Sequence, residues 1–185
     1  CLAERQAQAR SFVLPLQAGV GLAERRHDLL HVSGLDADAR IDHGHHHAAY
    51  VEKTRALVER TPLKNASLEE IVRAGSEQDS KALFNAAAQA WNHAFFWQSM
   101  RPAGGGEAHG PIAELIEDGF GSQRAFVQQF VTAAGDHFAS GWAWLVLDGS
   151  RLRIVDTRNA DTPLTTNLVP LLTLERFLFR LVAAG

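Results

Sequence analysis

Apolar residues recur every three or four positions through the first half of the chain, which is the period of an amphipathic helix. A first long helix is predicted from about Asp36 to a stop at Thr61-Pro62, because the residue before a proline disfavours helical backbone. The side of this helix that faces the core is expected to contain Val51, Thr54, Leu57 and Val58. The segment 1–34 has no sustained period, so its structure stays open.

Two further helices are predicted in the front half. A short one is expected at 67–72, where Ser67 is placed to cap it and Glu70 stands three residues later, as a capping box requires. The strongest helical pattern covers 79–100. Its apolar face carries, at spacings of three or four, Phe84, Ala88, Trp91 and Phe95.

Three glycines at 104–106, shortly after Pro102, indicate a domain boundary. We therefore predict an N-terminal helical hairpin domain at 1–104 and a C-terminal α/β domain at 105–185 that is truncated at its end.

The pattern changes from helices to strands within the second half. Helices are predicted at 112–120 and 123–137, and strands at 142–147, 152–155 and near 171–174. Ser122 is placed to cap the second of these helices, whose inward residues are Phe126, Phe130 and Ala134. The turn residues Asp148-Gly149-Ser150 predict a hairpin between the first two strands. Helices followed by strands imply the α+β class, with an N-terminal long-helix hairpin and a small three-stranded antiparallel sheet.

The composition of the chain limits the classes of partner that are expected. The 185 residues are 46% hydrophobic and 21% charged, which is the balance of a folded globular protein. A net charge of −3 provides no basic field for nucleic acid or an anionic membrane, so neither partner is expected. No apolar run approaches the roughly 20 residues of a membrane span, and a cytoplasmic protein is predicted. The lone Cys1 excludes an intramolecular disulfide.

Histidine is the residue type that suggests chemistry, with nine copies and a cluster between Asp42 and His47. On a helix Asp42, His46 and Tyr50 share one face, as do His43 and His47. A metal clip of two such residues is possible, although a solvated surface position is favoured for His45 and His47 because clustered histidine alone is a weak signal.

A second candidate lies in the strongest helix, where Gln89 and His93 are four residues apart among several aromatic side chains. A histidine in such surroundings is either hydrogen-bonded in the core or bound to a metal. A buried amide beside it favours the metal, because a metal-bound water satisfies the amide and tunes the metal.

Six segments give the chain a resemblance to a known family. They are, in order, HHAAYV, ALFNAAAQAWNHAFFW, GGGEAHG, FASGWAWLV, IVDTRNADTPL and PLLT. This order resembles that of the iron and manganese superoxide dismutases over roughly 130 residues. The resemblance implies a helical hairpin and an α/β domain, with iron or manganese between them, held by three histidines, one aspartate and a solvent molecule.

The resemblance also implies roles for individual residues. His93 matches a metal ligand, and His46 and Tyr50 match residues that line the substrate funnel, where the tyrosine takes part in proton delivery. Trp142 and Trp144 resemble the apolar surroundings of the metal, although a role as hairpin core residues is an equal alternative.

Two positions bear on which metal is used. Iron-type members of the family place a glutamine four residues before the helical histidine, whereas manganese-type members supply it from the N-x-D-S/T-P-L loop. This chain has Gln89 and Ala160 at these positions, which resembles the iron type, with manganese as the alternative. Hydrogen bonding by this glutamine to the bound solvent would set the reduction potential of the metal.

The chain departs from the family pattern at two of the expected ligands. Counting back from the funnel histidine places Asp42 at the first ligand, and His43 takes that position only with a shift of one residue. After the last strand the family continues D-x-W-E-H, where Glu175 could stand in for the aspartate but Phe179 cannot replace the histidine. The absence of that glutamate-histidine pair also weakens the expectation of a homodimer, because the family uses the pair to link the two metal sites across the dimer interface.

Three hypotheses about the protein follow from the sequence. The first is an enzyme that converts superoxide to oxygen and hydrogen peroxide with iron. The second is a catalytically impaired relative that keeps the fold for binding or scaffolding. The third concerns the sequence itself, since the agreement begins near Gly44 and stops near Leu174, as expected if the reading frame were wrong at both ends.

Overall fold

The computed structural model describes residues 46–99, 106–135 and 140–175. In chain order its elements are α3 (Ala48–Val58), η4 (Pro62–Asn65), α4 (Leu68–Glu77), α5 (Lys81–Gln98), α6 (Pro111–Phe120), α7 (Gln123–Gly135), β1 (Gly141–Asp148), β2 (Arg151–Arg158), η5 (Pro163–Thr165) and β3 (Val169–Glu175). Among the described residues, no helix is long and apolar enough to cross a membrane.

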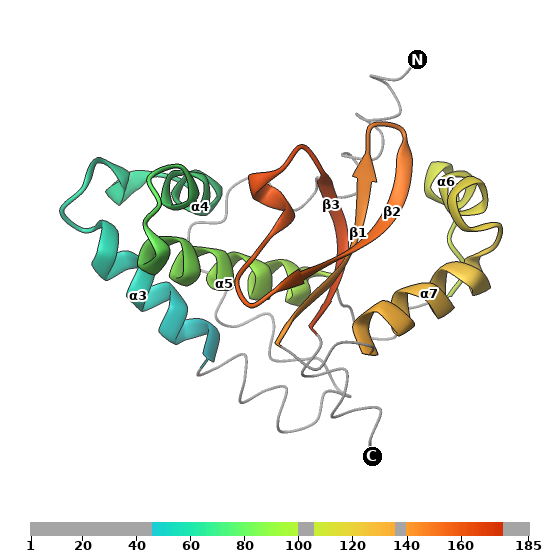
Figure 1. Ribbon diagram of the computed structural model, residues 1–185, viewed down its shortest axis with the longest axis horizontal. Helices are drawn as coiled ribbons and strands as arrows, with labels where there is room; N and C mark the ends of the chain where they lie inside the picture. Colours follow the sequence, from blue (N-terminus) through green and yellow to red (C-terminus); the bar gives the residue numbers. More distant parts are fainter. Residues whose placement is uncertain (1–45, 100–105, 136–139, 176–185) are drawn as a thin grey trace.

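The sheet forms the middle of the molecule. Its order is β2-β1-β3, and β1 pairs antiparallel with both neighbours. Helices α3 to α5 lie on one side of the sheet, while α6 and α7 lie on the other (Figure 1). The central strand is therefore buried on both faces, which explains why residues 141–147 are buried without interruption and nearly all apolar.

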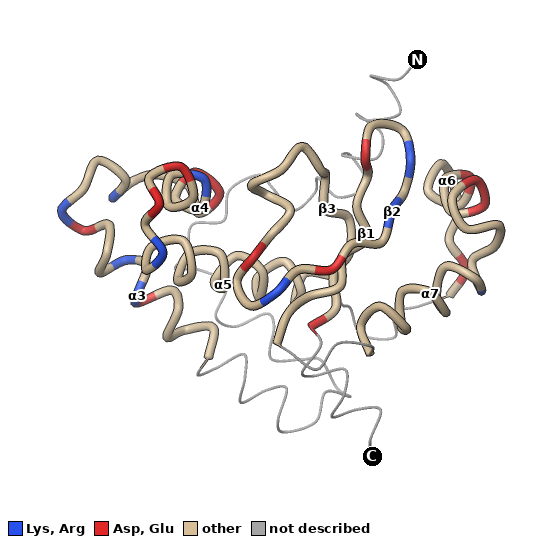
Figure 2. The backbone as a smooth tube through the Cα atoms, in the orientation of Figure 1, with Lys and Arg blue, Asp and Glu red and all other residues tan. Residues whose placement is uncertain are grey.

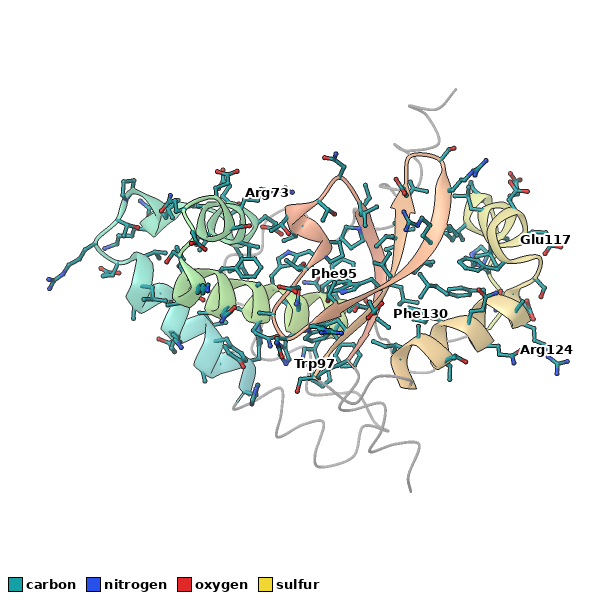
Figure 3. The ribbon with its side chains drawn as sticks, in the orientation of Figure 1. Arg73, Phe95, Trp97, Glu117, Arg124 and Phe130 are labelled. Carbon is teal, nitrogen blue, oxygen red and sulfur yellow. The ribbon has the colours of Figure 1, made fainter. Side chains whose placement is uncertain are left out.

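Side chains of β1 alternate between two cores, as the pleat of a strand requires. Trp142, Trp144 and Val146 pack with the helices of the hairpin, whereas Ala143, Leu145 and Leu147 pack with α6 and α7. Figure 3 shows Phe95 between α5 and the sheet and Phe130 between α7 and the sheet. One strand thus joins both helical layers.

The charged residues lie around these cores. Both signs occur together on α3, α4 and the β1–β2 hairpin (Figure 2). At the hairpin, Arg153 donates to Asp148 at 2.6 Å on the exposed surface. In Figure 3, Glu117 and Arg124 point away from the sheet. Such a mixed surface agrees with the small net charge.

The capping predicted from sequence is confirmed. The Ser67 hydroxyl accepts from the Glu70 backbone N–H, and the Glu70 carboxylate accepts from the Ser67 backbone N–H at 2.7 Å. The hydrogen bonds from Ser67, first from its backbone and then from its hydroxyl, lower the pKa of Glu70. Ser122 likewise accepts from the Ala125 N–H at 3.1 Å and caps α7.

The predicted fold class is confirmed, since a helical front half is followed by a three-stranded antiparallel sheet. The strands run longer than predicted because ladder pairing extends them beyond the central apolar runs, over polar residues in β1 and β2 and over Val169, Pro170 and Glu175 in β3. Phe126, Phe130 and Ala134 are buried as expected. The start of the first predicted helix and residues 1–34 lie outside the described residues, and the domain division at 104 stays a prediction.

One predicted core position is wrong. Thr54 and Val58 of α3 are buried and Val51 is half-buried, but Leu57 is 39% exposed. Because Leu57 directly precedes Val58, it lies about 100° from it around the helix, outside the buried side of α3. The apolar stripe of α3 is therefore narrower than the hydrophobic pattern suggests.

Helix α5 is the element that connects the layers. It packs against α4, α3 and β3, and its middle is buried almost all round. Close approach of α4 is possible because Gly75 has no side chain, and a Cβ there would lie 2.8 Å from the Phe84 backbone nitrogen. The position of α5 thus depends on a backbone contact with α4.

We expect Gly75→Ala to lower the free energy of unfolding by about 1–3 kcal/mol, since the new Cβ would collide with backbone atoms of α5. The matched control is Gly119→Ala, another helical glycine, whose added Cβ would lie at an ordinary 3.6 Å from Leu152. This control is expected to leave stability unchanged or raise it by up to about 1 kcal/mol. Urea denaturation measures both, and equal effects of the two variants would contradict the prediction.

Candidate metal centre

His93 lies at the centre of the candidate site. It is on the buried middle of α5 and is only 2% exposed. Its Nδ1 lies 2.7 Å from the backbone carbonyl oxygen of Gln89, one turn earlier on the same helix. A carbonyl only accepts, so Nδ1 carries the proton of the neutral ring and donates it. The lone pair of the neutral imidazole is therefore on Nε2, which is the arrangement typical of a metal-binding histidine.

Glu175 at the end of β3 faces this nitrogen. Its Oε1 lies 3.9 Å from His93 Nε2, which is too long for a hydrogen bond. Two ligands that each stand about 2.1 Å from one ion are separated by at most roughly 4.2 Å, so the spacing is compatible with a shared metal. The strand register explains this position, since Glu175 pairs with Trp142 of β1 on the face that meets α5.

Trp142 borders the same histidine. Its ring meets His93 edge-on, with centroids 4.9 Å apart, and it is 1% exposed. Trp144 lies one layer further away and stacks on Trp91 at 6.0 Å. Of the two tryptophans considered from sequence, Trp142 therefore contacts the site directly, while Trp144 packs in the adjoining core.

Residues at the start of α3 form the side of the candidate site that faces solvent. The rings of His46 and Tyr50 each lie 5.8 Å from the His93 ring, and they meet one another edge-on at 5.1 Å. His46 is exposed and Tyr50 is half-buried. The predicted shared face of His46 and Tyr50 agrees with the contact between their rings, while their place beside a metal stays a prediction.

His47 has a role that sequence reasoning missed. It was expected on the solvated surface, but it is half-buried, and its Nε2 lies 3.2 Å from the Ala90 carbonyl oxygen. Its ring also stacks on His93 at 6.4 Å. The neighbouring helix creates this contact, so the pattern of α3 alone could not reveal it. The contact between His47 and Ala90 therefore connects the start of α3 with α5.

Gln89 is the polar group next to His93 on α5. Its Nε2 donates to the Asn159 carbonyl oxygen at 3.4 Å. Its Oε1 is buried and makes no hydrogen bond within the described part of the chain. A buried polar atom without a partner is uncommon and calls for an additional group, of which a metal-bound solvent molecule is one.

These donors fit iron or manganese. An imidazole nitrogen and a carboxylate oxygen suit both metals. Between residues 46 and 175, within the described ranges, no group of three or more histidine, cysteine or acidic side chains is placed to hold an ion. His93 and Glu175 are thus two candidate ligands. Asp42, His43 and Phe179 lie outside the described residues, so the remaining ligand predictions stay predictions.

Comparison with known proteins shows which family this chain is similar to. Residues 36–101 match the description "Iron/manganese superoxide dismutases, alpha-hairpin domain", and residues 108–178 match "Iron/manganese superoxide dismutases, C-terminal domain". A superoxide dismutase (Fe) of Synechocystis is 48% identical over 134 residues, which cover 72% of this chain and 67% of the relative.

Two more relatives agree. A superoxide dismutase (Fe) of Leptolyngbya boryana is 45% identical over 150 residues, covering 80% of this chain and 75% of the relative. A superoxide dismutase (Mn/Fe) of Rickettsia bellii is 46% identical over 134 residues, covering 72% of this chain and 64% of the relative. The similarity therefore extends across both helical layers and the sheet.

We expect His93→Gln to reduce iron and manganese affinity by more than about 100-fold, since it removes the ring nitrogen that faces Glu175. Losing a group that only orients a ligand typically costs about 10- to 100-fold. Equilibrium dialysis followed by metal analysis measures the change. His109→Gln, at an exposed histidine before α6, is the control and should bind like the parent. Equal affinity of the two variants would remove His93 from the site.

Proposed function

The chain belongs to the iron/manganese superoxide dismutases, and from this premise we propose that it is an iron-type superoxide dismutase that converts superoxide to oxygen and hydrogen peroxide. The observation that carries the proposal is the orientation of His93, whose Nδ1 is held by a backbone carbonyl while Nε2 faces the Glu175 carboxylate. We propose His93 and Glu175 as metal ligands, with His43 or Asp42 as a further one.

Iron is the proposed metal, with manganese as the alternative. Relatives of this chain are named for iron or for manganese and iron. When bound, the metal supplies the one-electron oxidation and reduction that superoxide disproportionation requires. Glutamine at position 89 and alanine at 160 support the iron type, because the amide then comes from α5 and not from the loop after β2.

The chain's own residues would organise the surroundings of the reaction. Trp142 covers one side of the His93 ring and is itself buried, so it keeps bulk water away from the ligand. A dry environment strengthens the interaction between a small anion and a cation. The apolar side of the site thus favours binding of superoxide where its charge is neutralised.

Proton supply is the second task, since each peroxide formed from superoxide takes up two protons. The Tyr50 hydroxyl is a donor, and the Tyr50 ring lies 5.1 Å from the His46 ring and 5.8 Å from the His93 ring. His46 is exposed, so its ring can exchange protons with solvent. We propose this pair as the route by which protons enter.

A cytoplasmic location and a homodimer belong to the same proposal. The homodimer is a family expectation, and the location is an expectation from the apolar pattern of the sequence. Light scattering of the purified protein tests the first, and cell fractionation tests the second.

The experiment that tests the function is reconstitution of the purified chain with iron, followed by metal analysis and a superoxide dismutation assay. We expect about one iron per chain and activity well above that of free iron at the same concentration. A chain that holds no iron or manganese and shows no activity after reconstitution would overturn the proposal. The named relatives are all called superoxide dismutases, so the comparisons give no support to a non-enzymatic role.

We expect Gln89→Gly to change metal preference or redox tuning more than stability, because the amide next to His93 would be lost. Asn85→Gly, one turn earlier at an exposed position of α5, controls for the roughly 1 kcal/mol that glycine costs a helix. The measurement is the ratio of activities with iron and with manganese. If this ratio is the same in the parent and in Gln89→Gly, the proposed role of Gln89 is wrong.

A further inference from the structure

Asn159 has an unusual backbone conformation in the turn that follows β2. Its φ is +51°, in the left-handed region, and the turn is closed by the Asp161 N–H donating to the Arg158 carbonyl at 2.9 Å. Residues with a Cβ rarely adopt this region, and asparagine is among the most tolerant. The side chain of Asn159 is exposed and makes no hydrogen bond in the described part of the chain. Its contribution therefore comes from the backbone.

That backbone points its carbonyl oxygen at two side chains of the site. The oxygen accepts from Trp142 Nε1 at 3.1 Å and from Gln89 Nε2 at 3.4 Å. The Asn159 N–H donates to the Ser140 carbonyl at 3.0 Å, which ties the turn to the start of β1. One peptide unit thus links α5, β1 and the turn after β2.

Both bonded side chains flank His93. Gln89 lies one turn before it on α5, and the Trp142 ring meets it edge-on at 4.9 Å. The buried Asn92 amide lies beside the same indole, and with its oxygen 3.2 Å from Trp142 Nε1 it shares that single N–H with the Asn159 carbonyl. A shift of the Asn159 carbonyl would therefore release two neighbours of the candidate ligand together.

We propose that Asn159 is a positioning residue of the metal centre, which holds Gln89 and Trp142 beside His93 through its left-handed backbone. This inference rests on the proposed function for its effect on the metal. Groups that orient ligands and bound solvent tune both the affinity and the reduction potential of a metal, so the conformation of this turn is expected to bear on both.

The test compares three variants of the full chain. Asn159→Gly keeps the left-handed conformation available, whereas Asn159→Ala makes it unfavourable. Asp79→Ala is the matched control, since Asp79 is the other described non-glycine residue with positive φ, at +50°. It precedes α5 and lies about four helical turns before His93, so it carries a similar backbone strain away from the site.

In the iron-loaded protein, the measurements are the midpoint potential and the iron affinity. We expect Asn159→Ala to shift the potential and to weaken iron binding about tenfold or more. Asn159→Gly should behave like the parent. Asp79→Ala should lower the melting temperature about as much as Asn159→Ala but leave the potential unchanged.

A metal-free readout separates this inference from the proposed function. In nitrogen-15 correlation spectra of the apoprotein, we expect Asn159→Ala to move the Trp142 indole and Gln89 side-chain amide signals, assigned with Trp142→Phe and Gln89→Gly. Asn159→Gly and Asp79→Ala should leave them in place. A parent chain without iron binding and activity overturns the proposed function, while the spectra still decide the role of Asn159.

Three results would overturn the inference. They are unchanged side-chain signals in Asn159→Ala, equal changes in Asp79→Ala, and failure of Asn159→Gly to match the parent. Any of them would reduce Asn159 to an ordinary turn residue.

Discussion

Packing of α5 against the sheet is the interaction on which the rest of the structure depends. Trp142 and Trp144 of β1 are 1% and 0% exposed and meet the buried face of α5. Truncating a buried tryptophan to alanine typically costs about 3–5 kcal/mol, so these two rings are a large part of the stability of this contact. Without it, His93 on the helix and Glu175 at the end of β3 would not face one another.

The site uses groups that the fold already needs. His93 is held by the carbonyl of its own helix, Trp142 belongs to the core cluster, and Glu175 is brought close by strand pairing with β1. Burial gives the imidazole a dry environment, and the hydrogen bond at Nδ1 puts the lone pair of the neutral ring on Nε2, the nitrogen proposed to bind the metal. Stability and candidate chemistry therefore share the same residues, and a change that loosens α5 is expected to disturb both.

Helices and caps were predictable because their causes are local. The capping box of Ser67 and Glu70 and the inward face of α7 depend on spacing along one segment, and both are confirmed. Leu57 and His47 were assigned incorrectly, because their exposure depends on where α5 lies and not on α3 alone. The left-handed conformation of Asn159 could not be predicted from the sequence either, since asparagine is common in loops of many conformations.

By itself the sequence determined the α+β class, the order of the elements and the family resemblance, because periodicity, turn chemistry and motif order depend only on the order of residues along the chain. It also supplied the candidate site residues His93, Gln89, His46, Tyr50 and Glu175. Only the tertiary structure decided which of these candidates meet, that His93 presents Nε2 to Glu175, and that the Asn159 carbonyl joins Gln89 to Trp142. The physical reason is that these contacts join residues tens of positions apart, whose distances depend on the packing of whole layers and not on local spacing.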